Sequence, residues 1–300
     1  MFGKCLTRPS VWRGALHASS PIRAFSQSAL RAGYSVPGLN NEVKYQQEGV
    51  QKVFSPNAFE SNWTNYQRGL LDKLNEYVAG TDLDNKSPLD VAIATARQAD
   101  LATVFNLASQ AHNNHFFFRN LSPVPTVMPA RLTELVHRVF TTTENFKTEF
   151  LTTAASVFGS GWVWLVFDES RKLRILATYN AGTPYSDAYR RQNVDLNTNA
   201  DPARHTTNFT EAQSFQVGRT GSQVARVTYP LPLLCCKVWE HAWIEDFGVD
   251  GKEKYLDAWW DSIDWNSVNS AIPEGTDITR SRIAYDRSRS QYGATGFVNE

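Results

Sequence analysis

The amino-terminal part of this 300-residue chain lacks acidic residues. Its first 41 residues contain no Asp or Glu, although the whole chain has 30 of them against 30 Lys and Arg. The same segment carries four arginines, one lysine and several serines, a composition typical of a mitochondrial transit peptide. The sequence Arg23-Ala24-Phe25-Ser26 also fits a matrix-protease site, with cleavage after Phe25. We therefore expect a presequence over residues 1–25; a basic arm that stays attached is the alternative.

Long apolar runs are lacking too. No stretch approaches the roughly 20 consecutive apolar residues that a membrane-spanning helix needs, so we expect no membrane partner. Loss of residues 1–25 would remove four positive charges and leave 26 basic and 30 acidic residues, a formal net charge of −4. A chain of that charge is not a globally basic RNA-binding protein, and any contact with RNA must be local.

Cysteine is scarce. The chain has only Cys5, Cys235 and Cys236, and Cys5 would leave with the presequence. Two adjacent thiols on a strand rarely form a disulfide, and two thiols alone do not make a zinc site. We interpret Cys235 and Cys236 as small core residues. Hydrophobic residues are plentiful, at 42% of the chain with nine Trp, so a sizeable core can form.

Helix signals dominate the first half of the chain. Ser55-Pro56 and Ser87-Pro88 are typical helix starts, with a capping Ser before Pro at the first helical position. They predict one helix from 56 to about 80 and a second from 88 to about 121. In the second half we expect helices near 129–140 and 144–158, strands near 162–167, 172–178 and 231–238, and a helical end near 251–270.

The run from Lys237 to Trp243 reads K-V-W-E-H-A-W. It resembles the D-x-W-E-H-A-[YW] motif of iron/manganese superoxide dismutases, in which the Asp and the His are two of the four protein ligands of the metal. Lys237 occupies the position of the Asp. A protonated lysine has three donors and no lone pair, so it cannot ligate a metal ion.

Other segments resemble the same family and follow in the same order. The resemblance implies an α+β fold of the iron/manganese superoxide dismutase type. In that fold an N-terminal helical hairpin precedes a C-terminal domain with a three-stranded antiparallel sheet flanked by helices. The segments are Ala111–Phe118, Phe158–Val166, Tyr255–Trp260 and Ile263–Trp265.

The resemblance places the four ligand positions on Asn62, His115, Lys237 and His241. Two of the four are then lost, since Asn62 stands for a histidine and no histidine occurs between His17 and His112. The family's gateway tyrosine and its outer-shell glutamine correspond to Leu70 and Ala181, respectively. We expect no catalytic residue, no metal site and no cofactor. His115 and His241 are then ordinary buried histidines; a two-histidine metal site completed by water or a partner chain is the alternative.

The same motif predicts an interface. In the dismutases the Glu of this motif reaches across a dimer to the partner's metal-ligand His, so Glu240 and His241 are expected at a dimer-like contact. Lys237 has two readings. Its ammonium either replaces the charge of the metal in a buried polar cluster or extends from the strand end to solvent.

One polar segment interrupts the part of the chain that resembles the family, and a second polar segment follows it. Residues 184–229 form an insertion with little hydrophobic periodicity, and residues 273–300 form an Arg- and Ser-rich tail with interspersed tyrosines. Such segments suit phosphate contact and base stacking, although a plain surface loop and an ordinary tail are the alternatives. The candidate RNA contacts are Arg190, Arg191, Arg280, Arg282, Arg287 and Arg289.

These features together resemble the dismutase-like proteins of the fungal mitochondrial small ribosomal subunit. The resemblance implies a non-enzymatic constituent of the mitochondrial ribosome in the matrix. Its partners would be small-subunit proteins, a dismutase-like paralogue in a heterodimer, and local rRNA. A divergent mitochondrial iron/manganese dismutase and a free scaffold protein are the alternatives. The expected order is a presequence (1–25), an arm (26–55), a helical hairpin (56–122), an α/β domain (123–272) and a C-terminal extension (273–300).

Overall fold

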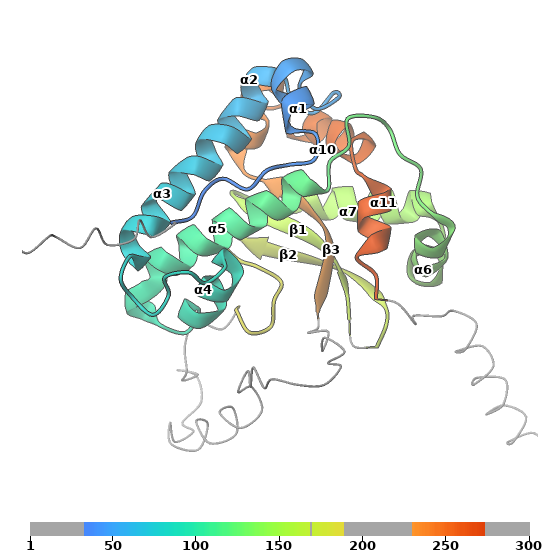
Figure 1. The fold of residues 1–300 in the computed structure, drawn as a ribbon. Helices are drawn as coiled ribbons and strands as arrows, with labels where there is room; N and C mark the ends of the chain where they lie inside the picture. The colour runs from blue at the N-terminus through green and yellow to red at the C-terminus, as the bar shows by residue number, and fades with distance from the viewer. Residues whose placement is uncertain (1–32, 169, 189–229, 274–300) are drawn as a thin grey trace, which may run out of the picture. The chain divides into compact units, whose positions relative to one another are not determined.

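The computed structural model describes residues 33–168, 170–188 and 230–273, which are coloured in Figure 1. The predicted presequence, most of the insertion and nearly all of the tail lie outside the described residues. The six arginines proposed to contact RNA lie outside them as well. Within the part that is described, no helix is long and apolar enough to span a membrane.

The first long helix begins where the sequence predicts it. Ser55 caps α2 (Pro56–Phe59), because its hydroxyl oxygen accepts a hydrogen bond from the backbone N–H of Ala58 at 3.2 Å. A wide π-helical segment, Glu60–Asn65, connects α2 directly to α3 (Tyr66–Val78). A shorter helix, α1 (Glu42–Glu48), precedes them within the arm. The π-helical segment carries Asn62, one of the predicted site residues.

The prediction of one helix over 88–121 is wrong. The chain forms α4 (Pro88–Thr95) and α5 (Ala102–Arg119), separated by an extended residue, Gln98, and a 3₁₀ turn, Ala99–Leu101. The side-chain amide of Gln98 donates to the carbonyl of Ala94 at 2.9 Å, which satisfies a carbonyl at the end of α4. The break lets α4 fold back against α5, while α3 packs on α5 to complete the helical hairpin.

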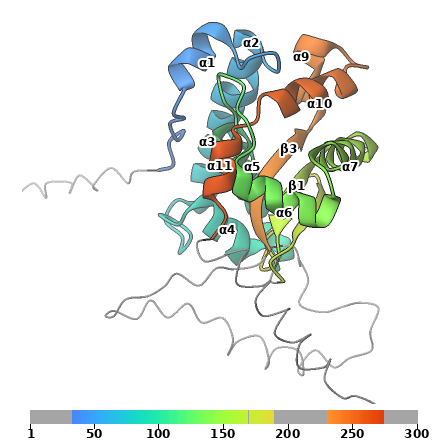
Figure 2. The same ribbon diagram turned by 90° about the vertical axis from the view of Figure 1, so that its right-hand side faces the viewer.

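The second half has the expected order of elements. Antiparallel strands pair in the order β2-β1-β3, and helices surround them (Figures 1 and 2). Asp264 caps α11, so the predicted helical end is divided in two near Ile263. The elements are α6 (Ala130–Phe140), α7 (Thr143–Ser156), β1 (Gly161–Phe167), β2 (Leu173–Tyr179), β3 (Leu231–Val238), α9 (Ile244–Phe247), α10 (Lys252–Asp261) and α11 (Trp265–Ser270).

The central strand β1 is buried along its whole length, because β2 and β3 pair with its two edges and α7 packs against it. Helix α5 packs against the neighbouring strand β3. Cys235 and Cys236 are free and buried in β3, as expected. The next residue of β3 is Lys237, which pairs with Trp162 in the ladder and lies in the same buried stretch. A strand this enclosed gives a lysine side chain no path to water, and the fold therefore forces Lys237 to find partners inside the protein.

Candidate functional site

Lys237 lies at the centre of a buried polar cluster formed by α5, β3 and the π-helical segment. Its exposed fraction is 0%. The Nζ atom donates hydrogen bonds to Oδ1 of Asn62 at 3.1 Å and to Oδ1 of Asn114 at 2.9 Å. Burial holds the pKa of this amine well below its ordinary value, because desolvation penalises the charged form. The reading in which Lys237 extends to solvent is wrong.

Aromatic rings close the cluster on its other sides. The Nζ atom lies 4.6 Å from the ring centroid of Tyr66 and 5.9 Å from that of Phe118. A cation over an aromatic face is attracted by the electron-rich ring, which partly compensates for lost hydration. Both oxygen acceptors of Lys237 are uncharged amides, so the cluster holds its amine with dipoles and rings.

The two asparagines are themselves oriented by further hydrogen bonds. The amide nitrogen of Asn114 donates to Oε1 of Gln67 at 3.0 Å and to the backbone carbonyl of Asn62 at 3.2 Å. The amide nitrogen of Asn62 donates to the backbone carbonyl of His241 at 3.0 Å. These bonds turn both Oδ1 atoms toward Lys237. The cluster is therefore built in two layers, with Gln67 and the His241 backbone behind the two asparagines.

His241 borders the cluster and has an unused nitrogen. Its ring lies 4.7 Å from that of Tyr66, centroid to centroid. Burial, with a smaller contribution from Lys237, lowers its pKa to about 3, so the imidazole is neutral near pH 7. Its Nε2 atom is buried and has no hydrogen-bond partner among the described residues. An unpaired buried nitrogen costs free energy.

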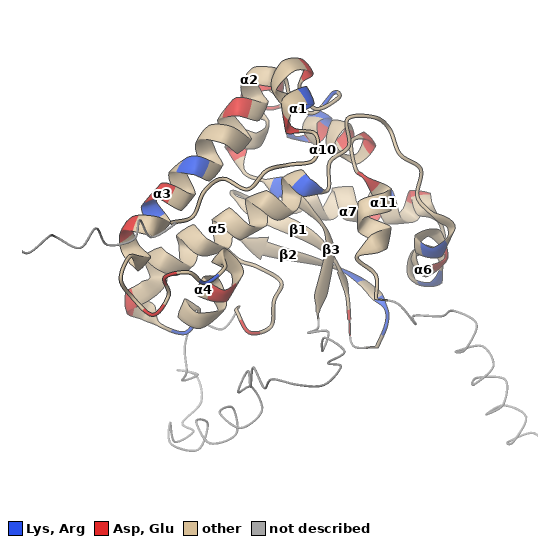
Figure 3. Cartoon of the chain, viewed as in Figure 1, with Lys and Arg blue, Asp and Glu red and all other residues tan. Residues whose placement is uncertain are grey.

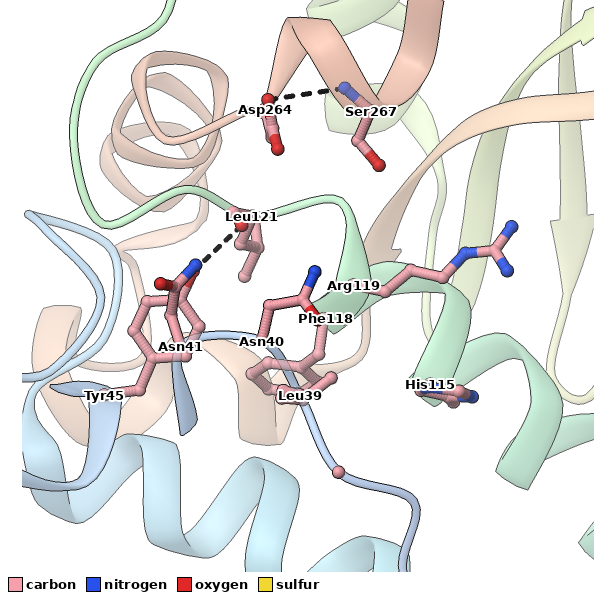
Figure 4. A pocket seen from close by; sticks show the side chains of 11 residues that line it. Leu39, Asn40, Asn41, Tyr45, His115, Phe118, Arg119, Leu121, Asp264 and Ser267 are labelled. Atoms are coloured by element: carbon pink, nitrogen blue, oxygen red, sulfur yellow. Dashed lines mark hydrogen bonds between the residues drawn. The ribbon is translucent and has the colours of Figure 1, made fainter. Parts of the chain in front are cut away.

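The structure corrects one predicted ligand position. His115 does not join Asn62, Lys237 and His241; Asn114, the residue before it, does. The His115 ring lies 5.8 Å from the ring of Trp63 and lines a separate polar pocket with Arg119 (Figure 4). Successive residues of a helix point about 100° apart, so neighbours on α5 face different surroundings.

The other residues of this pocket come from the arm, from the end of α5 with the residues just after it, and from the end of the fold. Phe118 belongs to both sites, since the centroid of its ring also lies 5.9 Å from Nζ of Lys237. The lining residues besides His115 and Arg119 are Gly38, Leu39, Asn40, Asn41, Tyr45, Phe118, Leu121, Asp264 and Ser267.

The two positions expected to tune a metal carry no suitable group. Ala181 is buried, and only its backbone carbonyl takes part in hydrogen bonding, accepting from the hydroxyl of Ser109. Leu70 is buried in a small apolar cluster with Leu71 and Ala111. Neither side chain can orient a metal-bound water, because neither has a donor or acceptor.

The donor set does not fit a manganese or iron site. The four side chains brought together are two amides, one amine and one imidazole, and both amide oxygens already accept from Lys237. These metals are held by imidazole and carboxylate ligands. Among the described residues, no group of three or more His, Cys, Asp and Glu side chains is placed to hold a metal ion.

Glu240 lies on the surface beside His241. Its Oε2 atom accepts a hydrogen bond from the hydroxyl of Ser160 at 2.7 Å. Phe158, two residues before Ser160, is 95% exposed, the highest value among the large hydrophobic side chains described. The predicted contact of Glu240 and His241 with a partner stays a prediction, to which Glu240 brings an exposed carboxylate.

Comparisons with known proteins agree with this geometry. Residues 128–196 and 205–271 match the C-terminal domain of iron/manganese superoxide dismutases. Small ribosomal subunit protein mS43 of Schizosaccharomyces pombe is 29% identical over 248 residues, covering 80% of this chain and 84% of that protein.

Two further relatives are a second small-subunit ribosomal protein and an iron superoxide dismutase. Small ribosomal subunit protein mS42 of the same yeast is 28% identical over 230 residues, covering 74% of this chain and 86% of that protein. Superoxide dismutase [Fe] of Plasmodium falciparum is 26% identical over 232 residues, covering 77% of this chain and 94% of the enzyme. The chain thus matches the C-terminal domain of the iron/manganese superoxide dismutases and has an α+β fold of that type.

Proposed function

We propose that this chain is a structural constituent of the mitochondrial small ribosomal subunit, a dismutase-fold protein without a metal site. The observation that carries the proposal is Lys237, whose buried amine is hydrogen-bonded to Asn62 and Asn114. Relatives include both ribosomal proteins and iron superoxide dismutases, so sequence identity alone leaves two classes of function. The side chains of the site favour the ribosomal class.

Dismutation requires a redox metal that is held in fixed geometry by several ligands. Of the four residues at this site only His241 is an ordinary ligand for such a metal, and Lys237 fills the space between the two asparagines. A divergent mitochondrial dismutase is the competing function. It would need these hydrogen bonds to break and the amine to leave a fully enclosed position.

We further propose that the partner is a second dismutase-fold chain, docked on the surface formed by Phe158, Ser160, Glu240 and His241. The Glu240 carboxylate is exposed and would accept a hydrogen bond from that chain. The relatives include two ribosomal proteins of this fold from one organism, which favours a heterodimer over a homodimer. The exposed Phe158 ring supplies the apolar area that such a contact would bury.

The remaining parts of the proposal rest on sequence. A presequence over residues 1–25 would direct the chain to the mitochondrial matrix, where this ribosome works. The insertion and the tail would add local contacts to rRNA through their arginines.

Two measurements test the function. We expect the protein to sediment with the small ribosomal subunit when mitochondrial lysate is separated on a sucrose gradient. The purified protein should contain far less than one equivalent of manganese or iron and show no dismutation above buffer. Sedimentation as free protein, together with stoichiometric metal, would establish the dismutase alternative instead.

A further inference from the structure

The turn between β1 and β2 concentrates positive charge. Arg171, Lys172 and Arg174 follow one another within four residues, and all three are exposed. The turn also contains two acidic residues. One is Asp168; the other, a glutamate at position 169, lies outside the described residues.

The carboxylate of Asp168 is engaged inside the turn. Its Oδ1 atom accepts from the hydroxyl of Ser170 at 2.6 Å and from the backbone N–H of Lys172 at 2.9 Å. Two backbone bonds complete the turn: the Asp168 N–H donates to the Lys172 carbonyl and the Arg171 N–H donates to the Asp168 carbonyl, both at 2.9 Å. The cations are therefore presented on a fixed loop, which lowers the entropy cost of holding them against a ligand.

Much of the remaining surface has the opposite charge. The segment after β3, from residue 245 to 261, carries six acidic residues, Glu245, Asp246, Asp250, Glu253, Asp257 and Asp261, against two lysines. Figure 3 shows red on α10 and blue at the tip of the β1–β2 hairpin. A polyanion would be repelled from the acidic helices and drawn toward the turn.

The turn also lies where the two extensions join the fold. Phe167, the last residue of β1, pairs with Leu231, the first residue of β3 and the second described residue after the insertion. Arg131 of α6 donates to the carbonyls of Ile272 and Pro273, which fixes the last described residues before the tail. In Figures 1 and 2 these chain ends and the turn lie on the same, lower side.

We propose that the β1–β2 turn is a docking site for rRNA, in which Arg171, Lys172 and Arg174 bind backbone phosphates. The inference rests on the proposed function and extends it by giving the described body of the protein its own RNA contact. Guanidinium groups bind phosphate oxygens in a bidentate manner, and lysine adds a point charge. The contact does not depend on the base sequence of the RNA, because backbone phosphates are the same at every nucleotide.

Charge reversal tests the site. The mature full-length chain, as wild type and as the triple variant Arg171→Glu, Lys172→Glu, Arg174→Glu, is titrated against purified small-subunit rRNA between 50 and 200 mM salt (on the order of physiological ionic strength). We expect affinity to fall about tenfold or more. The slope of log affinity against log salt should decrease by about 2, as expected for three lost contacts at about 0.7 each.

A matched control reverses three exposed cations elsewhere, Arg68, Lys73 and Lys86 on the helical hairpin. This control should change affinity less than twofold, and the circular dichroism of both variants should match that of the wild type. Equal RNA binding by the triple variant and the wild type would overturn the proposal. So would an equal loss in the control, or wild-type binding that does not depend on salt.

The same variants are compared on the sucrose gradient to separate this inference from the proposed function. A wild-type chain that fails to sediment with the small subunit refutes the function. A triple variant that sediments normally and binds rRNA normally refutes only the docking site.

Discussion

Replacement of Lys237 by alanine tests how the buried polar cluster is held together. The substitution removes the donor of two hydrogen bonds, at 3.1 and 2.9 Å, and leaves Oδ1 of Asn62 and of Asn114 buried without a partner. Each orphaned acceptor costs about 1–3 kcal/mol. The cavity left by the long side chain adds a further destabilisation of the order seen for other large-to-small core changes, about 2–5 kcal/mol.

One effect opposes these costs. The wild-type protein must desolvate an amine, and the alanine variant avoids that penalty of several kcal/mol. We therefore expect Lys237→Ala to lower the free energy of unfolding by about 2–4 kcal/mol, less than the sum of the separate costs. Lys237→Met keeps most of the volume and also avoids the desolvation, so it should lose less than half as much.

Urea unfolding followed by circular dichroism measures both variants. Lys254→Ala is the control, because Lys254 is exposed on α10 and should change stability by less than about 0.5 kcal/mol. If Lys237→Ala is as stable as wild type, the hydrogen bonds to the two asparagines do not stabilise the fold. If the methionine variant loses as much free energy of unfolding as the alanine variant, a cavity does not contribute to the loss.

Three further predictions concern pH, pairing and processing. His112 and His241 are neutral in the fold because burial lowers each pKa to about 3, so both take up a proton on unfolding at acidic pH. The melting temperature should therefore fall as pH drops from about 6.5 towards 3, and a melting temperature that does not change with pH would contradict this. Glu240→Ala should weaken pull-down of a dismutase-fold partner by roughly 2–5 kcal/mol without lowering the monomer's melting temperature, whereas Glu253→Ala should do neither. N-terminal sequencing of the mitochondrial protein should begin near Ser26, and finding Met1 there would refute cleavage.

The sequence predicted the fold because its signals are local. A capping serine before proline marks two helix starts, at Ser55 and Ser87, and both caps form as expected. The three strands were placed within a residue of their observed bounds, since short apolar runs flanked by turn residues define them well. The break between α4 and α5 was missed, because alanine and leucine on both sides favour helix and only the packing of one helix on the other demands a turn.

The site was predicted less completely. Asn62, Lys237 and His241 meet as expected, but the resemblance of Ala111–Phe118 to the family's segment placed the second ligand position on His115 and not on Asn114. A helical signal argued against that choice. Arg119 follows His115 by four residues, so both lie on one face of α5, and an exposed arginine marks that face as the outer one. Gln67 and Tyr66 were not predicted, since contacts across helices leave no mark on local sequence.

Lys237 is an amine that the chain carries from the moment of its synthesis. A metal ion must be delivered, selected from competitors and retained, and a protein that depends on it is only as abundant as its supply. A lysine side chain cannot dissociate, be exchanged or be removed by a chelator. On the proposed function, the folded state of this chain does not depend on the supply of manganese or iron, which suits a component that must be present in fixed proportion to the others of a large assembly.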